Sequence, residues 1–213
     1  ADSLSTVGAS TVSAGSGTLT VRTRTAGTLI DLGGADVLSG SPLTLGLTDA
    51  ELDSMTAGTL IVGRANAGNI SVSGTITATT FTTLHLITGA GVVDGTGGEQ
   101  DDLFVNSLAI ESVTGVGSAD TLNVAVGTLA ISNSTSGNVF LSNNVFSVSG
   151  ALTLGTVDGV SGVSNGGAGD VSVTNSGGMT VAEDARIDDG RLELKAVPSA
   201  VFFSYAAARR VDH

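Results

Sequence analysis

The feature that most constrains this chain is a phrase that it repeats. Residues 58–62 read Gly-Thr-Leu-Ile-Val, and ten positions after their glycine, residues 68–72 read Gly-Asn-Ile-Ser-Val. The same arrangement recurs sixty-nine positions later, at 127–131 and 137–141, and a weaker copy begins at Gly17, forty-one positions before the first. A recurring unit of this kind predicts a repeat architecture, in which each unit is stable only when it packs on its neighbours.

The repeated unit is a glycine turn followed by a short strand in which apolar residues alternate. Ile70 and Val72 lie two positions apart, so both point to the same side of the strand, and Leu141 has the corresponding inward position in the later copy. Strands of about five residues are not stable alone, but two of them with their turns make a coil of roughly twenty residues that can stack in parallel on the next. We therefore predict an all-β fold, a parallel β-helix (β-solenoid) of about ten coils. On this spacing, forty-one residues correspond to about two coils and sixty-nine residues to about three.

Composition and charge exclude several classes of protein. The chain has 31 glycines, no cysteine and a formal net charge of −12. No lysine or arginine occurs between Arg64 and Arg186, whereas many acidic residues fall there, so the surface repels phosphate and a nucleic-acid partner is not expected. No apolar run is long enough to cross a bilayer. The absence of cysteine removes thiolate chemistry and cysteine metal sites.

One segment breaks the β pattern. The sequence Thr-Asp-Ala-Glu that starts at Thr48 has the capping-box form, in which Thr48 caps the first turn and Glu51 reaches back to it. Leu52 and Met55 continue at helical spacing. We therefore predict one short helix or helical turn over 48–55, inserted in the solenoid either as a packing decoration or as a recognition loop.

The repeat runs without a break, which favours a single solenoid domain over residues 1–197 and leaves 198–213 as a C-terminal tail. Residues 201–205, Val-Phe-Phe-Ser-Tyr, are the most aromatic stretch, and two arginines follow them although the body is acidic. A solenoid of open coils ends in unpaired strand edges, which either carry a cap or pair with another molecule. The tail therefore either folds over the last coil as a cap or docks on a neighbouring copy and drives head-to-tail growth. The residues predicted to make this contact are Phe202, Phe203, Tyr205, Arg209 and Arg210.

A glycine-rich loop carries a cluster of carboxylates. Residues 95–98 read Gly-Thr-Gly-Gly, with acidic residues on both sides. Carboxylates clustered on a flexible loop supply the oxygen ligands that calcium prefers, although a solvated acidic loop has the same sequence. The calcium hypothesis names as ligands Asp94, Glu99, Asp101 and Asp102, and we expect no other cofactor.

The candidate catalytic motifs are weak. Residues 162–166 match Gly-x-Ser-x-Gly, but Ser164 as a nucleophile needs a strand-to-helix turn and a later histidine, and the only later histidine is His213. Residues 165–170 resemble a calcium-binding nonapeptide repeat, but the aspartate falls one position early and no tandem copy follows, which favours a glycine-rich coil corner. His85 stands between two leucines of an alternating strand, so we expect it to be an outward-facing surface residue. We therefore predict no catalytic residues and a protein that is not an enzyme.

Several phrases of the chain also occur together in one known family. They are Leu-Gly-Leu-Thr-Asp-Ala-Glu-Leu at 45–52 and the phrases at 58–63, 68–70, 84–89, 137–143 and 157–165. Together they resemble the internal repeats of filamentous-haemagglutinin-like bacterial exoproteins, over residues 17–182. The resemblance implies a right-handed parallel β-helix, export to the cell surface and a role in adhesion or matrix structure, and it carries no catalytic residue across. Such proteins are normally far longer and begin with a secretion-recognition domain, so the chain is expected to be a section of a fibre, or a truncated or stand-alone relative.

These observations favour a structural or adhesive extracellular protein, a section or subunit of a bacterial cell-surface fibre. Its expected partners are further copies of itself end to end, or a host or neighbouring cell surface or glycan. Two alternatives stay open. A β-helix carbohydrate-active enzyme needs converging acids, a basic residue and aromatic sugar platforms, yet Tyr205 is the only tyrosine and there is no tryptophan. An ice-binding solenoid needs a threonine on every coil, and residues 75–77 and 23–25 fit this pattern but most copies of the repeat do not.

Overall fold

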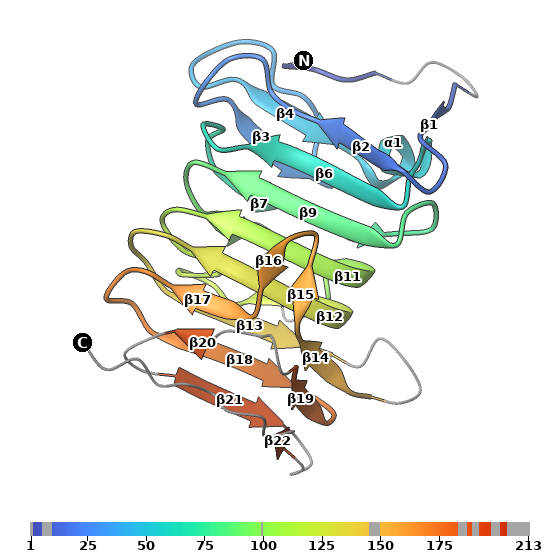
Figure 1. Cartoon of the computed structure of the whole chain (residues 1–213). Helices are drawn as coiled ribbons and strands as arrows, with labels where there is room; N and C mark the ends of the chain where they lie inside the picture. Colours follow the sequence, from blue (N-terminus) through green and yellow to red (C-terminus); the bar gives the residue numbers. More distant parts are fainter. Residues whose placement is uncertain are drawn as a thin grey trace.

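The computed structural model describes residues 2–5, 10–98, 100–144, 150–182, 187–188, 192–196 and 201–203. Over these residues the chain is mostly β, with long all-parallel sheets and a single helix of five residues. Figure 1 shows the strands stacked one above the next from the N-terminal end to the C-terminal end. The all-β prediction is therefore confirmed, and the arrangement is solenoid-like.

Most strands are short, as expected of a chain that turns at its glycines. The elements are β1 (Val12–Ser13), β2 (Thr18–Val21), β3 (Leu29–Leu32), β4 (Thr44–Leu47), α1 (Asp49–Asp53), β5 (Met55–Thr56), β6 (Thr59–Arg64), β7 (Ile70–Val72), β8 (Ile76–Thr77), β9 (Thr83–Thr88), β10 (Val92–Asp94), β11 (Leu103–Ser112), β12 (Leu122–Asn133), β13 (Val139–Asn143), β14 (Leu152–Leu154), β15 (Thr156–Val157), β16 (Val160–Ser161), β17 (Val163–Asn165), β18 (Val171–Asn175), β19 (Met179–Val181), β20 (Ile187–Asp188), β21 (Leu192–Ala196) and β22 (Val201–Phe203). β11 is longer because it runs from one face of the coil into the next, so that its first residues pair with β8 and its later ones with β9.

Successive coils place equivalent residues directly above one another. In the largest sheet, β2, β6, β9, β11 and β12 follow in that order and are all parallel. Leu60 pairs in register with Leu84, Leu84 with Leu108, and Leu108 with Leu129, at spacings of 24, 24 and 21 residues. The offset of sixty-nine residues between the two clearest phrases therefore spans three coil steps, as predicted.

The offset of forty-one residues does not correspond to two coils, and that prediction is wrong. Leu19 pairs directly with Leu60, so these two copies of the phrase lie on neighbouring strands. Between these two residues the chain forms β3, β4, α1 and β5 in that order. β3 pairs with β7 along one edge and with β4 along the other edge. These inserted elements lengthen one coil without adding a strand to the largest sheet.

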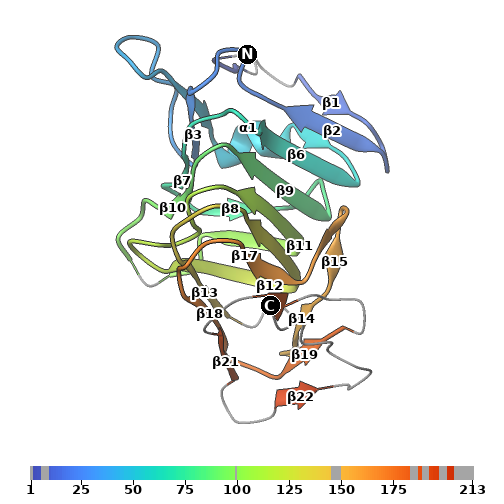
Figure 2. The ribbon, with the colours of Figure 1, turned by 60° about the vertical axis from the view of Figure 1, so that its left-hand side comes forward.

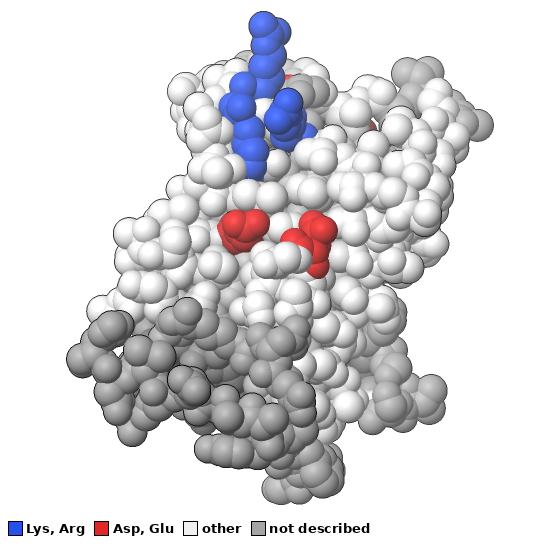
Figure 3. All heavy atoms as spheres, in the orientation of Figure 1, with Lys and Arg blue, Asp and Glu red and all other residues white. Residues whose placement is uncertain are grey.

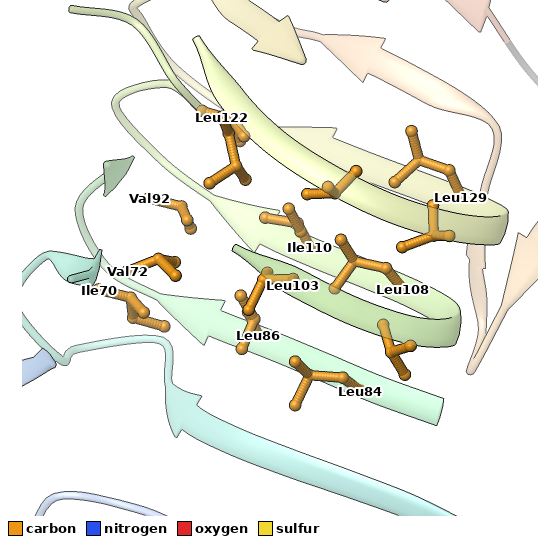
Figure 4. Packing of buried hydrophobic residues seen from close by; sticks show 14 of the residues in the cluster. Ile70, Val72, Leu84, Leu86, Val92, Leu103, Leu108, Ile110, Leu122 and Leu129 are labelled. Carbon is orange, nitrogen blue, oxygen red and sulfur yellow. The ribbon is translucent and has the colours of Figure 1, made fainter. Parts of the chain in front are cut away.

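The inward side chains form one continuous apolar interior. Val72 and Leu141, which were predicted to point inward, are at most 1% exposed. Figure 4 shows leucine, isoleucine and valine side chains from successive strands meeting inside the stack. Burial of one large aliphatic side chain contributes about 1.5–3 kcal/mol. The shared interior is therefore what stabilises strands that are too short to persist alone.

Two asparagine pairs brace corners of the later coils. Asn133 donates to Asn165, and Asn143 donates to Asn175, each through a bond of 2.8 Å between side-chain amides that are buried. The Asn143 side chain also accepts from the Val126 N–H at 2.8 Å and donates to the Val126 carbonyl at 3.1 Å. Because buried backbone polar groups need partners, these amides allow the chain to change direction inside the stack.

The short helix lies at the N-terminal end of the stack (Figure 1). The Thr48 hydroxyl accepts from the Glu51 N–H, and the Glu51 carboxylate accepts from the Thr48 N–H, so the predicted capping box is present. The helix begins after its cap at Thr48 and ends at Asp53, and Met55 already begins β5, so the predicted span ran two residues past the C-terminal end of the helix. Leu52 is buried in the apolar interior. In the described part of the chain, no helix is long and apolar enough to cross a membrane.

Candidate functional sites

The predicted calcium ligands come together only in part. β10 ends at Asp94, and β11 begins directly after Asp102, so the loop between them brings these two carboxyl groups to one corner of the coil. The Thr96 hydroxyl lies 2.8 Å from Asp94 Oδ1 and 3.3 Å from Asp102 Oδ2, and so links them. Asp101 instead accepts a hydrogen bond of 2.8 Å from Asn144 Nδ2. We term Asp94, Asp101 and Asp102 the acidic corner.

The surroundings of the acidic corner raise the pKa of two of its carboxyl groups. Asp102 is only 3% exposed. Its burial, and secondly the charge of Asp94, raise the pKa of Asp102 to about 6, and burial also raises the pKa of Asp101. Asp94 Oδ2 is buried with no hydrogen-bond partner in the described residues. The Asp102 carboxyl group, and to a smaller extent that of Asp101, therefore holds a proton more readily than an isolated carboxylate does.

The described residues do not by themselves form a metal site. Among them, no three His, Cys, Asp or Glu residues converge as metal ligands. Glu99, the fourth predicted ligand, lies outside the described residues. Calcium binding at the acidic corner stays a prediction, and Asp94 and Asp102 are the two ligands that the fold brings together.

Ser164 is placed as a strand residue. It lies in β17, which pairs with β12 and β20, and no helix follows it in the part of the chain that the structure describes. His213 lies outside the described residues. The neighbouring Asn165 is buried, and its amide donates to the carbonyls of Gly137 and Gly169 at 3.0 and 3.1 Å. This glycine-rich phrase therefore forms a braced coil corner, as expected.

A β-hairpin is inserted into one coil and folds back over the outside of the largest sheet. Leu129 and Ile131 are two residues apart in β12, but their partners in the next coil, Leu154 and Val163, are nine residues apart. The additional residues, 155–162, form the antiparallel pair of β15 and β16, which Figure 1 shows in front of β11 and β12. We term residues 155–162 the strap.

The turn and the packing of the strap explain its position. Asp158 and Gly159 have φ values of 46° and 86°, and a two-residue type I′ turn requires positive φ at both central positions. Beneath the strap the sheet presents alanines, whose small side chains leave room for it. The buried apolar residues of this contact, separate from the main interior, are Ala109, Ala130, Val157 and Val160.

His85 lies beneath the strap and not on the surface. It stands in register with Ile61 and Ala109 and so faces outward, as predicted. It is only 3% exposed, however, because the strap covers it, and the expectation of a surface residue is wrong. Its Nδ1 is 2.8 Å from Asp158 Oδ2 at the tip of the strap, and its Nε2 is 3.1 Å from Glu111 Oε1 on β11. We term Asp158, His85 and Glu111 the histidine bridge.

The histidine bridge is suited to holding charge and not to binding a metal ion. The two carboxylates approach opposite nitrogens of one ring, so the three groups do not converge on a shared point. The contact with Asp158 has hydrogen-bond geometry, whereas the contact of Nε2 with Glu111 is a close approach of charges without that alignment. Figure 3 shows the face of the molecule that carries the strap, with acidic atoms in its middle and basic atoms over the N-terminal strands.

The sequence contained a signal for the strap. Asp-Gly between two valines, at 157–160, is a strong indication of a tight hairpin, but it does not reveal where the hairpin packs. His85 and Asp158 are 73 residues apart in the chain. Their contact therefore depends on the stacking of several coils.

A column of hydroxyl side chains runs along the outside of the same sheet. On seven successive strands, the residue before an inward position carries a hydroxyl and pairs with its copies in register. These residues are Thr18, Thr59, Thr83, Ser107, Thr128, Thr153 and Thr180. Within the described part of the chain, only the Ser107 hydroxyl of this column has a hydrogen-bond partner, the Asn106 amide at 3.3 Å. The expectation that most copies lack an aligned threonine is corrected, because a threonine or serine stands directly before the inward residue on each of these strands, in three cases as the threonine of Gly-Thr-Leu, at Thr18, Thr59 and Thr128.

The predicted assembly residues are only partly described. Phe202 and Phe203 lie in β22, which pairs in parallel with β19 and so adds a strand to the stack. Tyr205, Arg209 and Arg210 lie outside the described residues. The choice between a cap and a docking tail stays a prediction.

Comparison of the chain with protein families, with curated proteins and with solved structures found no match. Function is therefore inferred from the stack itself, the acidic corner, the histidine bridge and the hydroxyl column.

Proposed function

We propose that this protein is a structural or adhesive component of the bacterial cell surface, a section or subunit of an extracellular fibre. The observation that carries the proposal is the parallel ladder, because the largest sheet follows one path from β2 to β21 with paired residues in register at each step. In such a stack each coil contacts only its neighbours, so the structure grows in length by repetition. A protein built in this way supplies reach and a long repetitive surface.

The finer description of the fold is part of the proposal. The resemblance to filamentous-haemagglutinin-like exoproteins implies a right-handed parallel β-helix, export to the cell surface, and adhesion to host or neighbouring cells or their glycans. In the largest sheet, the steps between paired residues of successive coils run from 19 residues, between Leu122 and Leu141, to 41 residues, between Leu19 and Leu60, and most of them exceed the expected length of about twenty residues. The proposed β-helix therefore has fewer coils than the ten first expected.

The use of polar side chains supports a structural role. The buried amides of Asn133 and Asn143 bond to the next asparagine of the stack and to nearby backbone. The histidine bridge fastens an inserted hairpin, and the Thr96 hydroxyl links two carboxyl groups of the acidic corner. In each case the polar groups hold coils and loops in place, which fits a scaffold better than a catalyst.

The two ends of the stack are the surfaces through which copies of the chain would join. At the N-terminal end, β2 pairs within the described residues only with β6, on one side. At the other end, β21 and β22 are the last described strands. Strand edges of this kind pair with another chain unless they are covered. Contact between unlike ends is heterologous and does not close, so repeated contacts give a fibre.

Electron microscopy of the purified protein, with and without residues 201–213, tests the proposal. Fibres that become short monomeric rods after the deletion are expected if the tail docks on the next copy. Rods that aggregate or lose stability after the deletion identify the tail as a cap. Compact particles without a rod shape would rule out the fibre role. A truncated protein that matches the parent in size and stability would refute both roles of the tail.

The hydroxyl column favours a second candidate, an ice-binding solenoid. Its members stand on adjacent parallel strands about 4.8 Å apart, and a regular row of hydroxyls can hold water molecules in a repeating order. Among the described strands no second row of hydroxyls stands beside it in this sheet, because the next outward column contains Ile61, His85 and Ala109. The fibre therefore remains the leading proposal.

Thermal hysteresis of the freezing point tests this candidate. Thr83→Val removes one hydroxyl from the column but keeps the β-branched shape, and Thr77→Val is a matched control on another face, because Thr77 lies in β8 and is exposed. Ice binding predicts hysteresis that Thr83→Val reduces and Thr77→Val does not. Absence of hysteresis in the unmodified protein would eliminate this function.

A further inference from the structure

We propose that the strap is a pH-sensitive device, which the histidine bridge holds closed while His85 is protonated and releases as the pH rises. The inference rests on the contacts around one buried imidazole and not on the fibre role. It assigns a conformational function to three residues, Asp158, His85 and Glu111, that the packing of the stack does not itself require.

The geometry of the histidine bridge matches a charged ring. Both ring nitrogens face a carboxylate oxygen, at 2.8 Å for Asp158 and 3.1 Å for Glu111. A protonated imidazole carries a hydrogen on both nitrogens, whereas a neutral one keeps a lone pair on one of them. In the closed position that lone pair would point at a carboxylate, and two carboxylates would face each other across an uncharged ring. Loss of the proton therefore disfavours the closed position.

The apolar contact between the strap and the sheet is small. Its tip packs two valines on two alanines, and its strands β15 and β16 contain two residues each. An isolated two-stranded hairpin is marginally stable at best. Both ends of the strap join strands of the stack, at Leu154 and Val163, so it can swing away while the coils stay paired. Opening is then a local event that costs less than unfolding the stack.

Among the described residues, the charged groups in contact with the His85 ring are the two carboxylates of the histidine bridge. The strap contributes Asp158 and β11 contributes Glu111, whereas the residues beside His85 in register, Ile61 on β6 and Ala109 on β11, carry no charge. Arg64 of β6 is engaged elsewhere, because its guanidinium donates to the Arg24 carbonyl at 2.8 Å. The attraction between the ring and the two carboxylates is thus present while the ring carries its second proton and is lost when a rise in pH removes that proton.

Opening of the strap changes the outer face of the sheet. Val157 and Val160 leave their contacts, and Ala109, Ala130 and the ring of His85 become accessible. The face then exposes a small apolar surface beside the half-exposed Glu111. The same chain thus has two surfaces, selected by the protonation of one side chain.

Hydrogen–deuterium exchange of the peptide segment 155–162, measured between pH 5 and 8.5 and corrected for intrinsic exchange, tests the device. Protection of this segment in the full chain should fall on the order of tenfold as the pH rises, the scale of one hydrogen bond to a charged group. Protection of β9 and β12 should stay constant. Nitrogen-15 spectra of the imidazole should show both ring nitrogens protonated at the low end of the range.

Three variants separate the device from general effects of pH. His85→Gln should remove the pH dependence of the strap, whereas His213→Gln, at the only other histidine, should leave it unchanged. Asp158→Asn keeps a residue type that tolerates positive φ and should weaken the dependence even if His85→Gln folds poorly. Strap protection that does not change with pH in the unmodified protein, or that changes equally in Asp158→Asn, would overturn the proposal.

Discussion

Replacement of Asn143 by alanine should destabilise the protein far more than the loss of a small side chain suggests. This amide is 2% exposed and takes part in three hydrogen bonds, two with the Val126 backbone and one with Asn175. Its removal leaves the Val126 N–H, the Val126 carbonyl and the Asn175 oxygen without that partner. Each buried polar group left unpaired costs about 1–3 kcal/mol. Water that enters the vacated space offsets part of this cost, so the free energy of unfolding should fall by about 3–5 kcal/mol.

Urea denaturation followed by circular dichroism measures this effect against a matched control. Asn66→Ala removes the same side chain from an exposed turn, where substitutions usually change stability by less than about 0.5 kcal/mol. Solenoids can also unfold in part, because each coil contacts only its neighbours. Exchange of the Val126 amide hydrogen therefore provides a local measurement, and its protection should fall in Asn143→Ala but not in Asn66→Ala.

The reasoning would be refuted by a particular pair of results. If both variants have the same urea midpoint, and if the Val126 amide stays protected in Asn143→Ala, then the asparagine pairs do not hold the corners of the coils. In that case the backbone at the corner would be paired without the amide.

Three further predictions concern the interior and the acidic corner. Leu141→Asp places a charge in the closed apolar interior and should lower the melting temperature strongly, since an unpaired buried charge costs several kcal/mol; melting like the unmodified protein would show that Leu141 does not face inward. Because the pKa of Asp102 is raised from 3.8 to about 6, the native state binds more protons than the unfolded chain between these two values. Stability should therefore fall, by at most about 3 kcal/mol, as the pH rises towards 6 and slightly beyond, and Asp102→Asn should flatten this slope in urea midpoints measured against pH. If the acidic corner holds calcium, millimolar calcium should raise the melting temperature at neutral pH, where Asp102 is mostly ionised, and less so in Asp94→Asn; a calorimetric titration without heat would leave the acidic corner as solvated surface.

The repeated phrases were sufficient to predict the all-β stack and the side of the strand that each apolar residue faces. Alternation in a strand has a period of two residues, so the inward positions of Val72 and Leu141 follow from the local sequence. The capping box at Thr48 is also local, because its two partners are three residues apart. Features that depend on neighbours along the chain were therefore predicted correctly, apart from the exact end of the helix.

The pairing of strands was less predictable, because it depends on the length of each coil. Insertions change that length without disturbing the repeated phrase. The elements between Leu19 and Leu60 make one coil step of forty-one residues, and the strap makes another of 32 residues, from Ile131 to Val163. An assumed constant coil length therefore predicted three coils correctly for the offset of sixty-nine residues, where no insertion occurs. It predicted two coils wrongly for the offset of forty-one residues, which contains an insertion.

What lies on the outside of the stack was decided by the tertiary structure alone. The sequence placed His85 on the outward side of its strand, but only the fold brings the strap over it and a carboxylate to each ring nitrogen. The hydroxyl column and the asparagine pairs likewise consist of residues separated by one or more coils. A local pattern determines the direction of a side chain, whereas its burial and partners depend on which distant segments the closed coils bring beside it.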